Sequence, residues 1–371
     1  MRTVVGWSIH VVTLPYSAPV RWAHHSETGN QVLLLCLHSH AGAIGIGEVT
    51  LKPGWYGASK NALIATLRDV FLPMLTGLDV SDPTAFHRAA QLIPENQVGR
   101  AVVDNALWDL HAAETGSPLW RQWEGESSAE VCWLVSRRSG GSMVEDAAHA
   151  VAEYGITTLK MKGGQGVEFD LGMLADVQRA VGAATRLFVD ANWHYSAQEA
   201  PHYIDALARA GIVAVEDPYS LAPDRWFEKV QRESPIPLIV DFSAGSLRDA
   251  RLFHERGVQA LSLKPARIGF TECLAMAAFA REAGIRVHVG FGGESSVGSF
   301  SSLQFASTLW CAGQWMPAET VFFLQNREDL LTRPLAVVDG RVQCPEVNSC
   351  SELIDWNKLA RLDEVGERGT L

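Results

Sequence analysis

From about residue 130 onward, the chain alternates between short apolar runs and amphipathic segments, and this repeat restricts the fold more than any other feature. Five of the runs end in a charged residue, namely Lys162, Asp190, Glu216, Asp241 and Lys264, so equivalent positions recur after 28, 26, 25 and 23 residues. Short apolar runs are typical of buried strands, and the amphipathic segments between them are typical of helices. Parallel strands joined by helices cross over right-handedly, and about eight such units close most naturally into a (β/α) barrel.

An open, doubly wound sheet is the alternative arrangement for such a repeat. It would gather polar residues at one or two switch points, where ligands bind. Here nearly every predicted strand ends in a charged group, which favours the ring of strand ends on the functional face of a barrel. The run MPAETV (316–321) is a weak eighth strand. We therefore predict an α/β fold with a barrel of the TIM type.

The first third of the chain has a different pattern, which predicts a mixed α+β domain. Three strand-like runs come first, at 4–14, 31–39 and 41–50, and segments with helical periodicity follow them up to Gly116. A polar, aromatic loop is expected at 18–30, between the first two strands. Taken with the repeat, this predicts a capping domain at 1–125 and a barrel at 126–325.

The last residues, 326–371, contain an Asp-Gly turn within RPLAVVDGRVQCPE, which is typical of a short hairpin. Because the barrel is complete before this point, we expect the segment to pack back on the N-terminal capping domain.

Charge and cysteine content narrow the possible partners and the compartment. The 371 residues carry a net charge of −11, which argues against binding to nucleic acid or to an anionic membrane surface. Six cysteines are scattered without a CxxC pair, and Cys36, Cys132 and Cys273 lie in apolar runs, so we expect buried thiols in a reducing cytoplasm. No apolar run reaches the ~18 residues of a membrane span, and the N-terminus alternates like a strand rather than a signal peptide.

Three carboxylates, Asp190, Glu216 and Asp241, close three consecutive predicted strands. One such acid alone would as often cap a helix or pair with a cation. Three on neighbouring strands would be costly to bury without a common partner. Since no His or Cys shares their spacing, the oxygen-only set points to Mg²⁺, with Mn²⁺ possible, rather than zinc.

Lys160 and Lys162 project from one face of a predicted strand, since a strand has a period of two residues. A solvated loop pair is the alternative, but the flanks of TTLKMKGG are those of a buried strand. Burial and neighbouring cations lower the pKa of an ammonium group, so one of these lysines could act as a general base. Lys264, further round the ring, would face them across the mouth, an arrangement suited to moving a carbon-bound proton.

The ordered set of KMK (160–162), DAN (190–192), EDP (216–218), Asp241 and Lys264 resembles the enolase superfamily, specifically its muconate-lactonizing subgroup. The resemblance covers most of the chain, including the helix ALWDLHAAETGSPLW of the capping domain. It implies a modified (β/α)7β barrel, an α+β N-terminal capping domain that the C-terminal segment completes, and Mg²⁺ bound by Asp190, Glu216 and Asp241.

The resemblance also implies roles for individual side chains. Lys162 would be the general base on one face of the substrate and Lys264 the acid or base on the other, while Lys160 would steady the substrate carboxylate. Asn192 would lie in the outer shell of the metal, and Glu294 would be a site acid after the seventh strand.

Three features depart from the family pattern or compete with it. The third ligand run usually reads DES, and here it reads DFS, so Phe242 replaces an acid. His288 lies in the seventh strand, but because a lysine already occupies the sixth-strand position, we interpret this histidine as a wall residue rather than part of a His/Asp dyad. The eighth strand has no Asp-x-Asp, which disfavours a dipeptide epimerase.

Substrate specificity is expected to lie in the cap loops. In the loop at 18–30, Arg21 could hold a distal carboxylate and Trp22 could form a wall of the pocket. The run LKPGWYGAS is a second lid candidate, with Trp55 as its wall residue.

These features predict a metal-dependent isomerase that removes the proton α to the carboxylate of a small-molecule substrate, as a racemase, epimerase or cycloisomerase. A dehydratase, of the o-succinylbenzoate synthase or hydroxy-acid type, is the alternative enzyme, since two lysines alone do not decide among these outcomes. The alternative from another class is a non-catalytic barrel that binds a metal or ligand. We also expect a homo-oligomer, an octamer by resemblance.

Overall fold

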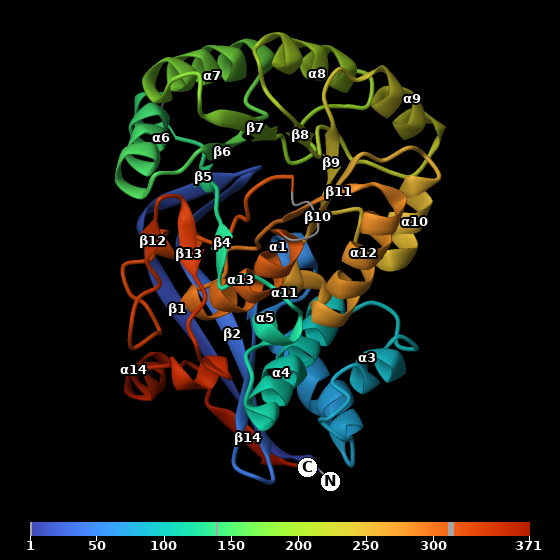
Figure 1. The fold of residues 1–371 in the computed structure, drawn as a ribbon, viewed down its shortest axis with the longest axis vertical. Coiled ribbons are helices and arrows are strands. Elements are labelled where there is room, and N and C mark those ends of the chain that lie inside the picture. Colours follow the sequence, from blue (N-terminus) through green and yellow to red (C-terminus); the bar gives the residue numbers. More distant parts are fainter. Residues whose placement is uncertain (1, 139, 311–314) are drawn as a thin grey trace.

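The computed structural model describes residues 2–138, 140–310 and 315–371. It contains a curled parallel sheet with helices on its outer side and, next to it, an antiparallel sheet packed against further helices (Figure 1). The two ends of the chain lie together on the antiparallel sheet, at the bottom of Figure 1. This is the α/β architecture that the repeat predicts.

The antiparallel sheet has the strand order β14-β1-β2-β3. Its strands are β1 (Val4–Trp22), β2 (His25–Ser39), β3 (Ile44–Thr50) and β14 (Glu367–Thr370). The loop predicted at 18–30 is therefore wrong. Backbone pairing continues past an irregularity after Pro15 up to the pair Trp22 and His25, so the polar and aromatic residues belong to a long hairpin with a two-residue turn. Their alternation of buried and exposed side chains is that of a strand with one face covered.

The helices that follow β3 are α1 (Pro53–Tyr56), α2 (Lys60–Thr66), the π-helix η1 (Leu67–Phe71), the 3₁₀ helix η2 (Leu72–Leu75), α3 (Ala85–Ala90), α4 (Gln97–Thr115) and α5 (Leu119–Gln122). The segments from α2 to α4 pack with one face of the sheet in a single hydrophobic cluster. The longest, α4, lies directly on β3. A Cβ atom at Gly45 or Gly47 would lie 2.3 Å or 2.1 Å from a carbonyl oxygen of α4, so only glycine allows this approach.

The parallel sheet has the order β11-β10-β9-β8-β7-β6-β5, so every strand pairs with its neighbour along the chain. The strands are β5 (Trp133–Val135), β6 (Thr158–Lys162), β7 (Arg186–Asp190), β8 (Val215–Glu216), β9 (Leu238–Val240), β10 (Ala260–Leu263) and β11 (Arg286–Val289). The helices are α6 (Gly140–Tyr154), α7 (Val167–Val181), α8 (Ala200–Arg209), α9 (Arg225–Glu233), α10 (Leu247–His254), α11 (Pro265–Ile268), α12 (Phe270–Ala283) and α13 (Ser296–Trp310). The predicted alternation is thus confirmed for seven strands.

The predicted eighth strand at 316–321 is not a regular strand, and this part of the prediction is wrong. Ala318 forms a single parallel bridge with Val131. The Ala318 N–H donates to Glu130 O at 2.9 Å, and the Glu319 N–H donates to Val289 O, also at 2.9 Å. Pro317, which has no N–H, interrupts the ladder. The segment nevertheless hydrogen-bonds to β11 on one side and to the residues before β5 on the other.

The C-terminal segment returns to the start of the chain. The strands β12 (Val337–Val338) and β13 (Arg341–Gln343) form the expected hairpin, whose turn residues Asp339 and Gly340 both have positive φ, and β13 pairs with β4 (Ser128–Glu130). The 3₁₀ helix η3 (Phe322–Gln325) precedes this hairpin, and η4 (Cys350–Glu352) and α14 (Trp356–Leu362) follow it. The last strand, β14, then pairs with β1.

Two further observations bear on the sequence predictions. Cys36, Cys132 and Cys273 are buried, as predicted, and burial raises the pKa of the Cys36 thiol to about 12, whereas Cys311 lies outside the described residues. Within the described chain, every helix is too short or too polar to cross a membrane.

Candidate active site

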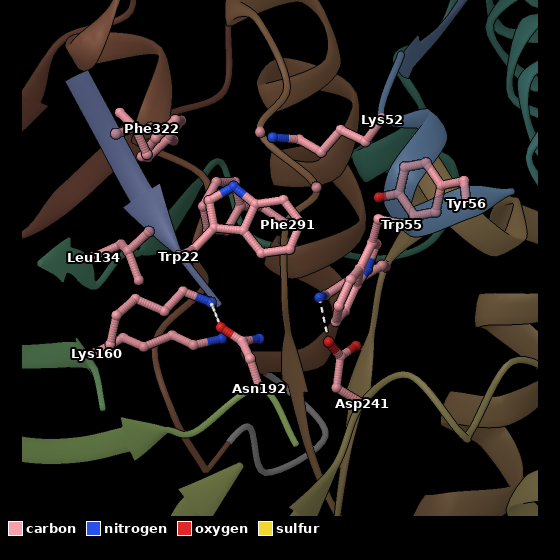
Figure 2. Close-up of a pocket in the computed structure, with 15 residues that line it drawn as sticks. Trp22, Lys52, Trp55, Tyr56, Leu134, Lys160, Asn192, Asp241, Phe291 and Phe322 are labelled. Atoms are coloured by element: carbon pink, nitrogen blue, oxygen red, sulfur yellow. Dashed lines mark hydrogen bonds and ion pairs between the residues drawn. The ribbon is translucent and has the colours of Figure 1, made fainter. Parts of the chain in front are cut away.

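A cavity of about 520 Å³ opens at the carboxyl ends of the parallel strands, beneath the β1–β2 hairpin and the α1 segment (Figure 2). Seven of the residues predicted for the site line it: Trp22, Trp55, Lys160, Lys162, Asn192, Asp241 and Lys264. Asp190 and Glu216 are buried next to the lining residues that they contact.

Sheet register places the predicted lysine and acids side by side. Lys162 on β6 is the backbone partner of Asp190 on β7, and Asp190 is the partner of Glu216 on β8. Because these residues close their strands, their side chains share the same edge of the sheet. The turns that follow are strained, since Asn192, Trp193 and Asp217 have φ values of 46°, 58° and 41°.

Lys160 lies at the bottom of the cavity among three carboxylates. Its Nζ is 2.8 Å from both oxygens of Glu216, 2.8 Å from Glu319 Oε1 and 3.1 Å from Asp190 Oδ2. Burial alone would lower the pKa of this ammonium group, but the carboxylates outweigh burial and raise the pKa well above its usual value. Lys160 is therefore a fixed positive charge.

Lys162 is in a different electrostatic environment. Its Nζ donates to Asp190 Oδ2 at 2.6 Å and to Asn192 Oδ1 at 3.1 Å. Burial lowers the pKa of Lys162, and the nearby charge of Lys160 acts in the same direction. Conversely, although burial favours the neutral acid, the ammonium groups of Lys162 and Lys160 hold the pKa of Asp190 well below its usual range.

Lys264 reaches the cavity from the end of β10, where it precedes α11, and its Nζ donates to Asp241 Oδ2. Burial opposes the charge on Lys264, but Asp241 raises its pKa. Arg267, which the sequence analysis missed, lies 3.2 Å from Asp241 Oδ1 and donates to the Asp241 carbonyl at 2.8 Å. The sequence feature that could have indicated Arg267 is its position three residues after Lys264, in KPAR.

His288 was interpreted as a wall residue, and the structure gives it a specific partner. Its Nε2 is 2.8 Å from Glu319 Oε1, and both side chains are buried. Glu319 is not among the residues predicted from the sequence, although its position as an acid in the weak eighth run was a signal for it. Glu319 thus pairs with Lys160, and His288, on β11, supports Glu319.

The residues can be tested for their fit to a divalent cation. In the described part of the chain, one group of three side chains could gather around an ion, namely Glu216, His288 and Glu319, and it shares only Glu216 with the predicted trio. Lysine ammonium groups contact the oxygens of Asp190 and Asp241 instead. Burial raises the pKa of Glu216 well above its usual value, and the like charges of Asp190 and Asp241 add to this effect. Such crowding of buried oxygen donors fits a hard divalent cation, which would relieve it.

Phe242, which replaces the usual acid, belongs to an aromatic cluster that closes the cavity. The ring of Trp55, from α1, stacks on Trp193 at 4.9 Å and meets Phe242 edge-on at 5.1 Å. The rings of Trp22 and Trp55 meet edge-to-face, with their centres 5.0 Å apart. The predicted lid residue therefore packs onto aromatic side chains at the ends of β7 and β9.

Two predicted residues lie beside the cavity rather than in its lining. Glu294 is buried, and its Oε1 accepts the Gly292 N–H at 2.8 Å. Arg21 is exposed and does not line the cavity. Arg137, missed at the end of the run VCWLVSR, instead holds the hairpin, because its guanidinium donates to the carbonyls of Ala23 and Gly163.

Comparison with known protein families gives two matches that together span most of the chain. Residues 7–122 match the family described as mandelate racemase / muconate lactonizing enzyme, N-terminal domain. Residues 142–348 match the family described as enolase C-terminal domain-like.

Similar curated proteins include muconate cycloisomerase 1 of Rhodococcus opacus, which is 25% identical over 93% of this chain and 94% of its own length. The N-succinylamino acid racemase of Thermus thermophilus is 28% identical over 91% of each chain. Among solved structures, the muconate lactonizing enzyme of Pseudomonas fluorescens, complexed with muconolactone, has a TM-score of 0.90 at 23% identity, covering 98% of this chain and 100% of its own. The L-Ala-D/L-Glu epimerase of Bacillus subtilis has a TM-score of 0.87 at 23% identity, covering 95% and 99%. These structures share the fold.

Proposed function

The chain belongs to the enolase superfamily, in its muconate-lactonizing subgroup, and on this basis we propose that it is an isomerase that moves the proton on the carbon α to a carboxylate. Racemisation and epimerisation remove and return this proton, whereas cycloisomerisation adds a proton at the same carbon after ring closure has formed the enolate. The names of the similar proteins, which include a cycloisomerase, a racemase and an epimerase, support this choice.

The observation that carries the proposal is that two lysines from separate strands line one cavity. Lys162 closes β6 and contacts Asn192, while Lys264 follows β10 and contacts Asp241. Figure 2 shows Asn192 and Asp241 on two sides of the cavity floor. A substrate between the two amines would have one amine near each face of its α-carbon. One amine could then remove the proton and the other could return it, which is the requirement for inversion.

Lys160 would hold the substrate carboxylate. It is a buried ammonium group on the cavity floor, fixed by Glu216 and Glu319, and so needs no reorganisation when negative charge develops. Asn192 would orient the Lys162 amine through its Oδ1. The aromatic cluster around Trp55 would exclude water from the reacting atoms.

We propose Mg²⁺ as the resident metal, held by Asp190, Glu216 and Asp241, with Mn²⁺ as the alternative. When bound, such an ion would supply positive charge next to the enolate oxygen. The lysines that contact Asp190 and Asp241 would then be available to the substrate. Glu319 would remain a partner of Lys160, and His288 a partner of Glu319, rather than ligands.

The proposal includes the finer architecture. We infer that residues 126–325 form a closed (β/α)7β barrel, with the segment around Ala318 as the last stave between β11 and β5. Residues 1–125 would form the cap and 326–371 would complete it, in keeping with the pairing of β14 with β1. A homo-oligomer remains a prediction.

The test is deuterium exchange at the α-carbon. The protein would be incubated in D₂O with Mg²⁺ and a panel of N-acylated amino acids, dipeptides, muconates and sugar acids, and mass spectrometry would follow deuterium uptake and products. We expect uptake that requires the metal and is lost in Lys162→Ala or Lys264→Ala. Loss of water from the substrate would favour the dehydratase instead. No exchange with any compound, together with no Mg²⁺ binding by calorimetry, would contradict the proposal and favour the non-catalytic alternative.

A further inference from the structure

The upper part of the cavity is a continuous apolar surface, which we call the apolar wall. Its residues are Val20, Trp22, Leu134, Phe291 and Phe322, which pack in one hydrophobic cluster and line the cavity. Figure 2 shows Trp22, Phe291 and Phe322 above the cavity and the charged Lys160 and Asp241 below it. A substrate carboxylate held at Lys160 would therefore direct the rest of the molecule toward the apolar wall.

Among the described residues that line the cavity, no cationic side chain without an acidic partner lies at the apolar wall. Four lysines line the cavity, and within the described chain no arginine or histidine does. Lys160, Lys162 and Lys264 belong to the acid cluster on the floor. The fourth is Lys52, which lies toward the upper part of the cavity in Figure 2.

The charge of Lys52 is already balanced. Its Nζ donates to Glu27 Oε2 at 2.7 Å, and the same ammonium lies 5.1 Å from the centre of the Trp22 ring. Both members of the ion pair are mostly buried, with side chains 11% and 23% exposed. Glu294, a buried acid in the adjoining loop, adds no positive charge, and Arg21 lies outside the lining.

We infer that the substrate is a monocarboxylate whose far end is uncharged and apolar, such as an aryl or alkyl group, and that a dicarboxylate is a poor substrate. This inference rests on the proposed function, since it extends from the end held at Lys160. A second carboxylate at the apolar wall would be buried without a partner, which is strongly unfavourable, whereas the burial of an apolar group there is favourable.

Matched compounds test this directly. N-(3-Phenylpropanoyl) and N-succinyl derivatives of alanine, leucine and phenylalanine differ only in a phenyl or carboxylate terminus. Unpaired cis,cis-muconate serves as a further dicarboxylate, because its second carboxylate is the nucleophile in ring closure. For each pair that is turned over, we expect the neutral member to have a kcat/KM for deuterium exchange at least about 100-fold higher than that of the charged member. A preference for the charged members would overturn the inference and leave the proposed function standing. No turnover of any compound would overturn the proposed function, and the inference with it.

Two variants test the cause of the preference. Leu134→Lys places a new cation on the apolar wall, and Glu27→Gln frees the charge of Lys52. Each is expected to shift the kcat/KM ratio at least about tenfold toward the charged member of a pair. The control is Val338→Lys, which adds the same charge at an exposed position of β12 and should leave the ratio unchanged. If Glu27→Gln folds, as judged by circular dichroism, and its ratio matches that of the unaltered protein, the inference is wrong.

Discussion

Glu48 joins the cap to the parallel-sheet domain, and its replacement by glutamine should change how stability depends on pH. Its carboxylate, on β3, accepts the N–H groups of Ser295 at 2.7 Å and Gly298 at 3.1 Å, at the start of α13. Burial raises the pKa of Glu48 from the ordinary 4.5 to about 7, an effect that these hydrogen bonds reduce without cancelling. The folded state therefore binds this proton more tightly than the unfolded state does.

The sign and size of the effect follow from proton linkage. Since the folded pKa of Glu48 is raised, its contribution to stability is fully present below about pH 4.5 and is lost as the pH rises to about 7. A pKa difference of this size corresponds to about 3 kcal/mol. In Glu48→Gln the fall in unfolding free energy between pH 4.5 and 7 should be smaller by up to about 3 kcal/mol, whatever constant offset the amide introduces.

The assay is equilibrium unfolding in urea at several pH values, followed by circular dichroism, with a chelator present so that metal binding does not contribute. Glu255→Gln is the matched control, because it removes the same charge from an exposed position. Equal pH dependence in Glu48→Gln and the unaltered protein would refute the argument that burial of this carboxylate dominates its hydrogen bonds.

Four further predictions concern the site and its support. Lys162→Ala and Lys264→Ala should each slow deuterium exchange by at least about 100-fold, measured by mass spectrometry, and a variant that retains full exchange would have no role in proton transfer. Trp55→Ala, which removes the ring stacked over the cavity, should raise KM about tenfold for exchange, and an unchanged KM would contradict its role as a lid. Asp109→Ala, which leaves two buried backbone N–H groups without an acceptor, should lower the unfolding free energy in urea by about 2–5 kcal/mol. Mg²⁺ at about 100 times its dissociation constant should stabilise the protein by about 3 kcal/mol in the same assay, and Asp190→Asn should reduce this effect.

Much of the fold could be predicted because its signals are local. The alternation of apolar runs and amphipathic segments indicates parallel strands and helices, and the Asp-Gly dipeptide at 339–340 indicates its hairpin turn. The errors arose where the local signal was ambiguous. The residues at 18–30 are polar and contain Pro and Gly, as a loop would, yet pairing across the hairpin makes them strands.

The sequence by itself determined which chemical groups meet at the strand ends. Lys162, Asp190 and Glu216 close consecutive strands of one sheet, and parallel strands bring their carboxyl ends to one edge whatever the rest of the chain does. That rule depends only on the order of the strands along the chain, so the sequence is sufficient to predict which groups meet there.

Only the tertiary structure decided which charge pairs with which. Glu319, 159 residues from Lys160 along the chain, fixes its ammonium group, and Glu27 balances Lys52 next to the apolar wall. The same side chains with other partners would leave a free cation at the far end of the cavity and favour a different substrate. Ion pairing depends on distances of a few ångströms between residues that are remote in sequence, and no local pattern of residues encodes such distances.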